Sequence, residues 1–170
     1  MSDEIKKGLV GVISDETKVS EVMPEINSLT YRGYAVQELC EKCNFEQVAY
    51  LLLHGELPNP DELKAFEEYE RTNRNISDTL KNIIKNYPKN AHPMDTTRTT
   101  VSHMGLEDPD TEDNSPESNM RKSMRLLAQI STAVAANFRI RKGQEIINPD
   151  LSLSFSENFF HMSFGKVPSP

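Results

Sequence analysis

Residues 115 to 143, SPESNMRKSMRLLAQISTAVAANFRIRKG, are the longest stretch of the chain with a helical hydrophobic period. Apolar or small side chains recur there in heptad-like steps of three and four residues, which places them on one face of a helix. They are Met120, Met124, Leu127, Ser131, Val134 and Phe138. Ser115-Pro116-Glu117 is a helix-start signal, and the cationic stretch before Gly143 suits a helix end. The stretch predicts one long amphipathic helix.

Almost every segment from Tyr34 onward has the same helical period. Helix starts are predicted at Asn44 (with Gln47 as capping-box partner), Asn59, Ser77 and His92, and helix ends at Gly55, before Pro88 and at Gly105. A final helix holds Phe155, Phe159 and Met162 and ends at Gly165. The segment from Val48 to Leu53 is apolar nearly all round, which predicts a helix buried on most sides.

Residues 8 to 31 are the only stretch that favours β structure. Val10, Val12 and Ile13 precede a polar turn, and short apolar runs broken by Pro24 and Asn27 follow it. This pattern is typical of small edge strands. The sequence therefore predicts a mainly α protein with an N-terminal β segment at residues 1–33 and helices over residues 34–170.

The composition excludes several classes of protein. Of the 170 residues, 36% are hydrophobic and 26% charged, which suits one globular domain. A net charge of −7 argues against a general binder of nucleic acids or anionic membranes. The longest purely apolar run is far too short to span a bilayer, and the first residues lack the apolar core of a secretory signal. Two cysteines close together favour a reducing cytoplasm.

Cys40 and Cys43 have the spacing of a redox or zinc motif. A redox pair needs a thiol at a helix N-terminus, and a zinc site needs two more ligands, whereas these cysteines fall late in a helical stripe with Val36 and Leu39. We therefore predict buried structural thiols.

The four histidines show no spacing typical of a helix-borne metal site. They are His54, His92, His103 and His161. His92 is expected to cap a helix, and His54 and His103 to lie near helix ends. No catalytic constellation emerges.

A further stripe raises the possibility of a subunit contact. Met94, Thr97, Val101 and Met104 step by three and four residues, and such residues let two helices pack closely. The pattern fits an intrachain core or an interface between subunits, and by itself it favours the core.

Several short sequence segments, in their order and spacing, resemble the amino-terminal part of the citrate synthase family over nearly the whole chain. They are residues 7–12 (KGLVGV), 28–34 (SLTYRGY), 45–52 (FEQVAYLL), 55–58 (GELP), 92–95 (HPMD) with Arg98-Thr99, 115–117 (SPE), 139–143 (RIRKG), 157–159 (ENF), Phe164-Gly165 and Pro168. The sequence of residues 34–39 (YAVQEL) resembles the bacterial 2-methylcitrate synthases more than the citrate synthases. His54, and Thr97 where leucine is common, depart from the family pattern.

The resemblance implies an acyltransferase that condenses an acyl-CoA, propionyl-CoA or acetyl-CoA, with oxaloacetate and releases CoA. It implies an almost all-α fold of a large and a small domain, and a homodimer whose interface includes the helix from His92 to Met104. This favours the subunit-contact interpretation of Met94, Thr97, Val101 and Met104. CoA is a substrate, no cofactor or metal is implied, and the expected setting is cytoplasmic, in the tricarboxylic acid cycle or propionate catabolism.

The family takes its catalytic histidines, aspartate and substrate-binding arginines from sequence beyond the point that matches Pro170. We therefore carry over no catalytic, cofactor-binding or metal-binding residue to this chain. The chain is expected to represent a fragment, with the rest of the large domain and the small domain absent, and to be inactive and poorly behaved alone. Two alternatives stay open: a non-catalytic interaction or dimerisation module, and redox or zinc chemistry at Cys40 and Cys43.

Overall fold

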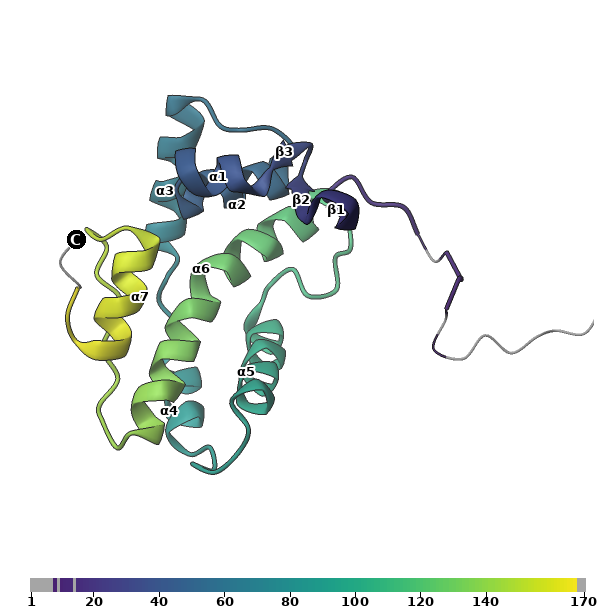
Figure 1. Cartoon of the computed structure of the whole chain (residues 1–170). Coiled ribbons are helices and arrows are strands. Elements are labelled where there is room, and N and C mark those ends of the chain that lie inside the picture. Colours follow the sequence, from purple (N-terminus) through teal and green to yellow (C-terminus); the bar gives the residue numbers. More distant parts are fainter. Residues whose placement is uncertain (1–7, 9, 14, 168–170) are drawn as a thin grey trace, which may run out of the picture. The chain divides into compact units, whose positions relative to one another are not determined.

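The computed structural model describes residue 8, residues 10–13 and residues 15–167. The chain divides into two compact units, Met1–Leu57 and Pro58–Pro170, where the composition predicted one domain. The first unit holds β1 (Ser20–Met23), a 3-10 turn η2 (Pro24–Ile26), β2 (Ser28–Tyr31), β3 (Tyr34–Ala35), α1 (Val36–Lys42) and α2 (Phe45–His54). The second holds α3 (Pro60–Thr72), α4 (Asp78–Lys85), α5 (Pro93–Glu107), α6 (Pro116–Arg141) and α7 (Phe155–Phe164) (Figure 1). The mainly α fold class with small N-terminal strands is confirmed.

The strands form one antiparallel sheet in the order β1-β2-β3. Tyr31 pairs with Tyr34, and both residues between them, Arg32 and Gly33, have positive φ, 50° and 88°. Two left-handed residues make the tight turn whose twist matches a hairpin. The hairpin carries the sheet past the predicted limit at residue 33, so that limit is two residues too early. The described residues from Val10 to Ile13 form no strand, which corrects the prediction there.

Helix α2 begins and ends where local signals place it. Asn44 and Gln47 form the predicted capping box, with distances of 2.8 and 2.9 Å, and Gly55 ends α2 with a φ of 96°. Within α2 only Ala49 and Leu51 of the apolar run are fully buried, and the other members are half-buried. The prediction that this helix is buried on most sides is therefore too strong.

The second unit is built around α6, which contacts α3, α4, α5 and α7. In Figure 1, α5 and α7 lie on opposite sides of this long helix. Its most buried side is not the predicted stripe, of which only Met124 is fully buried. Small residues occupy that side instead: Ser118, Ala128, Thr132, Ala133, Ala135 and Ala136. Small side chains let several helices approach one central helix closely, and this explains the difference.

The core of the second unit joins α4, α5 and α6. It consists of Ile76, Leu80, Ile84, Met104, Ala133 and Ala136. The predicted caps Asn59, Ser77, His92 and Ser115 all accept hydrogen bonds from the first turns of their helices. Gly105 does not end α5, which continues to Glu107.

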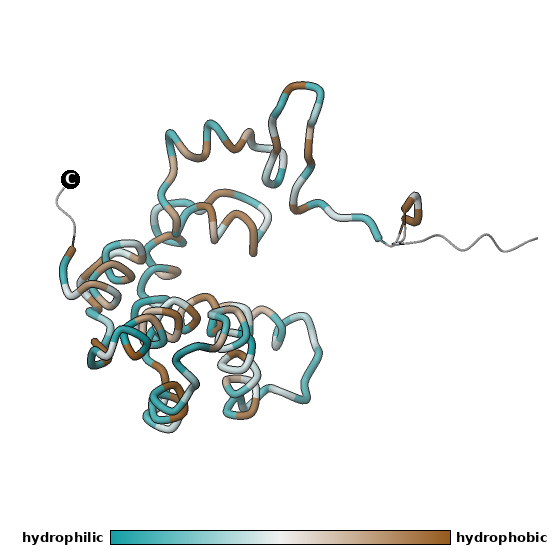
Figure 2. Tube along the Cα trace, turned by 60° about the horizontal axis from the view of Figure 1, so that its bottom comes forward, coloured by the Kyte–Doolittle hydropathy of each residue, from teal (hydrophilic) through white to brown (hydrophobic). Residues whose placement is uncertain are grey.

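Hydrophilic and hydrophobic stretches alternate along the chain (Figure 2). Within the part of the chain that the structure describes, no helix combines the length and the apolar character needed to cross a membrane.

Candidate functional site

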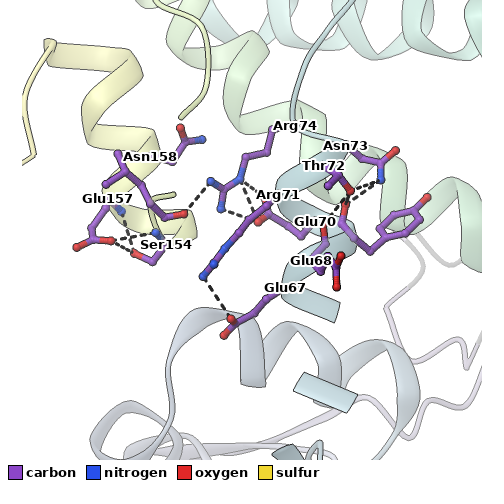
Figure 3. Close-up of polar contacts among 12 residues, drawn as sticks. Glu67, Glu68, Glu70, Arg71, Thr72, Asn73, Arg74, Ser154, Glu157 and Asn158 are labelled. Carbon is purple, nitrogen blue, oxygen red and sulfur yellow. Dashed lines mark hydrogen bonds and ion pairs between the residues drawn. The ribbon is translucent and has the colours of Figure 1, made fainter. Parts of the chain in front are cut away.

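A buried polar network centred on Arg74 joins the end of α3 to the segment before α7 (Figure 3). Arg74 and Glu70 are 0% and 1% exposed, and the Arg74 Nη2 donates to Glu70 Oε2 at 2.6 Å. The Nε of Arg74 donates to both carboxylate oxygens of Glu70, at 2.8 and 3.0 Å. Its Nη1 donates to the carbonyl oxygens of Asp150 and Leu153, at 3.0 and 2.9 Å. Each nitrogen of the guanidinium therefore donates to a partner within the chain.

Helices α6 and α7 complete this network. Thr132, on the small-residue side of α6, donates to the Arg74 carbonyl oxygen at 2.8 Å. The side chain of Asn158, which is 1% exposed, accepts a hydrogen bond from the Asp150 N–H at 2.9 Å. Buried polar groups are costly unless they are paired, and here the partners come from separate segments. The arrangement fixes α3, α6 and α7 to one another and leaves Arg74 committed to a structural role.

The acidic loop after α5 is held against α6 by arginines. Arg125 contacts Asp108 at 2.7 Å and Asp110 at 2.8 Å, and Arg121 contacts Asp110 at 3.1 Å. Hydrogen bonds from Arg121 and then Arg125 lower the pKa of Asp110 from 3.8 to about 2. Burial is the largest single influence on the pKa of Asp108 and raises it, but the hydrogen bonds from Arg125 and the Asp110 N–H, together with the charge of Arg125, lower it by more. These carboxylates remain ionised near neutral pH.

A hollow between the end of α5 and α6 is lined in part by Lys122 and Arg125. Both cations already have partners, because Lys122 donates to the Asp113 carbonyl oxygen at 2.6 Å and Arg125 is held by the two aspartates. Neither cation is therefore available to bind an anion in this hollow.

The stripe predicted to contact a second subunit divides between two environments. Met94 is 65% exposed, Thr97 and Val101 are half-buried, and Met104 is 6% exposed within the core. The side of α5 that faces its own unit carries Thr96 and Thr100 as well as Met104. Thr97 and Val101 line a small hollow between α5 and α6 with residues that include Ile130 and Val134.

The cysteine prediction is wrong. Cys40 is exposed and Cys43 is half-buried, and both thiols are free. Helix α1 has only seven residues and buries a single side chain, that of Leu39. The apolar spacing of Val36, Leu39, Cys40 and Cys43 predicted a buried face that includes both thiols, whereas the buried face of α1 includes only Leu39.

Three of the four histidines, His54, His92 and His103, serve local structure. The Nδ1 of His92 accepts the Met94 N–H at 3.2 Å, which confirms the predicted cap. His103 lies 3.2 Å from Glu107, and the ring of His54, at the end of α2, stacks on that of Tyr50 with centroids 4.1 Å apart. Among the described residues, no group of three or more His, Cys, Asp or Glu side chains is placed to hold a metal ion.

Comparison with known proteins places this helical chain in a family. The family model described as "Citrate synthase, C-terminal domain" matches residues 8–170. The chain belongs to the citrate synthase family, as the resemblance predicted.

Individual relatives agree with this assignment. The chain is 47% identical over 165 residues to a 2-methylcitrate synthase of Mycobacterium tuberculosis, covering 97% of this chain and 42% of that protein. It is 48% identical over 166 residues to a citrate synthase of Mycolicibacterium smegmatis, covering 98% and 44%. The crystal structure of citrate synthase from Pyrobaculum aerophilum superposes with a TM-score of 0.90 at 30% identity, over 98% of this chain and 44% of that one. The chain thus spans less than half the length of the relatives it matches.

Proposed function

We propose that the chain is part of an enzyme that condenses an acyl-CoA with oxaloacetate and releases CoA. The observation that carries this proposal is the 47% identity over 165 residues to a 2-methylcitrate synthase. Relatives of similar identity are named citrate synthase, so propionyl-CoA and acetyl-CoA are both candidate acyl donors. CoA is a substrate, and the setting that we propose is cytoplasmic.

The role that we assign to these residues is a helical scaffold, the amino-terminal part of the large domain. The buried groups support this role. Arg74 is paired with Glu70, and Arg125 is held by Asp108 and Asp110, so neither is free to clamp a carboxylate of oxaloacetate. Condensation requires a base, an enol stabiliser and carboxylate clamps in one site, and we propose that these groups come from sequence outside residues 8–170.

The proposed partner is a second copy of the whole enzyme, contacted through the outer side of α5. Met94 is 65% exposed, and Thr97 and Val101 are half-buried and line a small hollow between α5 and α6. An exposed methionine on a helix surface suits packing against another helix. Met104, the fourth member of the stripe, instead packs inside its own unit.

The test is a chimera in which residues 8–170 replace the matching segment of the Mycobacterium tuberculosis 2-methylcitrate synthase. Oxaloacetate-dependent CoA release is measured with propionyl-CoA and with acetyl-CoA. We expect a dimeric chimera whose turnover lies within about tenfold of the parent, a barrier change of about 1.4 kcal/mol. A folded, dimeric chimera without turnover would contradict the proposal.

The exposed side of α5 also suits a non-catalytic module that docks onto an intact subunit. This alternative is supported if the chimera is inactive while the 170-residue chain forms a stoichiometric complex with the intact relative. The substitution Met94→Asp should weaken that complex, and Thr99→Asp is the control, because Thr99 is exposed on the same helix but lies about 140° around it from Met94. If both variants bind the intact relative as tightly as the wild-type chain does, the outer side of α5 is not the contact.

A further inference from the structure

Cys40 and Cys43 are the two cysteines of the chain and lie together at the end of α1. Cys40 is exposed and Cys43 is half-buried, so reagents in solution reach at least one of the thiols. They are not part of any cluster of three or more metal-ligating side chains among the described residues. Nothing in the scaffold role uses them.

The backbone places the two thiols within reach of each other. Cys43 is the C-cap of α1, and its N–H donates to the Leu39 carbonyl oxygen at 3.0 Å, which keeps Cys43 in register with the last helical turn. Because this is a helical bond from residue i to i−4, the Cα atoms of Cys40 and Cys43 are about 5 Å apart, as helix geometry sets for residues three apart. A disulfide joins Cα atoms about 4.4–6.8 Å apart, so the backbone already allows a bridge and closure requires rotation of the cysteine side chains.

That rotation is possible because Cys43 is the residue at which the helix ends. Its φ of −123° and ψ of 149° are extended, so its side chain can turn while its N–H stays bonded to the Leu39 carbonyl oxygen. The next residue, Asn44, is held by the capping box of α2, where its N–H donates to Gln47 Oε1 at 2.9 Å. The adjustment is therefore confined to the four residues from Cys40 to Cys43.

We propose that Cys40 and Cys43, although they lack the helix N-terminus that activates the thiol of a catalytic redox pair, close reversibly to a disulfide by exchange with a low-molecular-weight disulfide such as glutathione disulfide. The exposed Cys40 thiolate attacks one sulfur of glutathione disulfide and releases one glutathione thiolate. The Cys43 thiolate then attacks the Cys40 sulfur and releases the second. The two cysteines are oxidised, glutathione disulfide is reduced to two glutathione molecules, and the two cysteine protons pass through solvent to the released thiolates.

The pair is reversible for two physical reasons. An exposed disulfide is open to attack by thiols, and exposed or strained disulfides have the higher reduction potentials typical of labile bonds. The closed loop contains only four residues, so closure restricts the unfolded chain less than a long loop would. The proposal concerns α1 alone and does not depend on the proposed enzymatic activity.

The test uses the folded 170-residue chain, whose helical content is checked by circular dichroism in the same buffer. The chain is incubated with glutathione disulfide at several protein concentrations, quenched with acid and weighed by intact-mass spectrometry. We expect a product that has lost two hydrogen atoms, retains no glutathione and has no free thiol. Its rate of formation should be independent of protein concentration, and reduced glutathione should restore both thiols.

Two single substitutions separate the steps. Cys43→Ser should stop at one retained glutathione on Cys40, because the second thiol is missing. Cys40→Ser should react several-fold more slowly, because only the half-buried Cys43 remains. Three results would overturn the proposal: a wild-type chain that keeps its glutathione adduct, disulfide-linked dimers as the main product, or thiols that react only after urea unfolds the chain.

Discussion

The buried pair of Glu70 and Arg74 gives the sharpest test of the scaffold, and the substitution Glu70→Gln probes it. Glutamine keeps the shape of the glutamate side chain but removes its charge. The Arg74 guanidinium, which is 0% exposed, would then lie in the core without a counter-charge. Its hydrogen bonds to the carbonyl oxygens of Asp150 and Leu153 would remain.

The expected loss follows from burial. Removing one partner of a buried ion pair costs about 3–5 kcal/mol, because an uncompensated charge is left behind. The glutamine side-chain oxygen still accepts a hydrogen bond, and a hydrogen bond to a charged group contributes about 1.5–3 kcal/mol. We therefore expect Glu70→Gln to lower the free energy of unfolding by about 1.5–2 kcal/mol.

The assay is urea unfolding followed by far-ultraviolet circular dichroism. The matched control is Glu67→Gln, the same substitution on the same helix, at a residue that also pairs with an arginine four positions later, Arg71 at 3.2 Å. That pair is partly exposed, with side chains 24% and 32% exposed, and such pairs contribute about 0.3–0.5 kcal/mol. Equal losses for Glu70→Gln and Glu67→Gln would refute the role assigned to the buried network.

Three further predictions concern the core, the acidic loop and a helix cap. Ile84→Ala removes a 0% exposed side chain from the core of the second unit and should cost about 2–5 kcal/mol in urea unfolding; a smaller loss would show a loosely packed core. The pKa of Asp110 is lowered from 3.8 to about 2 in the folded chain, so its ion pairs stabilise the fold above pH 4 and that contribution disappears as the pH falls through about 2. Between pH 5 and pH 2 the free energy of unfolding should therefore fall further for the wild type than for Asp110→Asn. An equal fall for the two proteins would contradict this prediction. Asn59→Ala removes the two hydrogen bonds that the Asn59 side chain accepts at the start of α3, at 3.0 Å each. It should lower the free energy of unfolding by about 1 kcal/mol. An unchanged urea midpoint would mean that water replaces the cap.

Helix starts were predictable because the signals that set them are local. Asn44, Asn59, Ser77, His92 and Ser115 each cap the helix that follows. A cap needs only a side chain and the first backbone N–H groups of its own helix, all of which lie within four residues in the sequence. Tertiary contacts do not have to be known for such a prediction.

The buried side of α6 was not predictable in the same way. Hydrophobicity pointed to Leu127, Val134 and Phe138, which are half-buried, whereas Ala128 and Ala135 are fully buried. Which side of a central helix is most enclosed depends on how closely its neighbours approach, and small residues permit the closest approach. Gly105 was expected to end α5, but the helix continues to Glu107 although a glycine within a helix costs about 1 kcal/mol.

The Arg74 network and the exposure of the cysteines also needed the structure. The four-residue spacing of Glu70 and Arg74 is common on exposed helix surfaces and does not reveal burial. The partners that complete the network, Thr132 and the Asp150 carbonyl, lie 58 and 76 residues from Arg74 in the sequence. No local pattern connects positions so far apart.

The most direct test of the scaffold role measures oxaloacetate-dependent release of CoA by the purified 170-residue chain and by the chimera, side by side, with propionyl-CoA and acetyl-CoA. If the catalytic groups lie outside residues 8–170, the chain alone releases CoA no faster than buffer while the chimera turns over. Oxaloacetate-dependent turnover by the chain alone, abolished by a single substitution within it, would contradict the scaffold role and place the chemistry inside these residues.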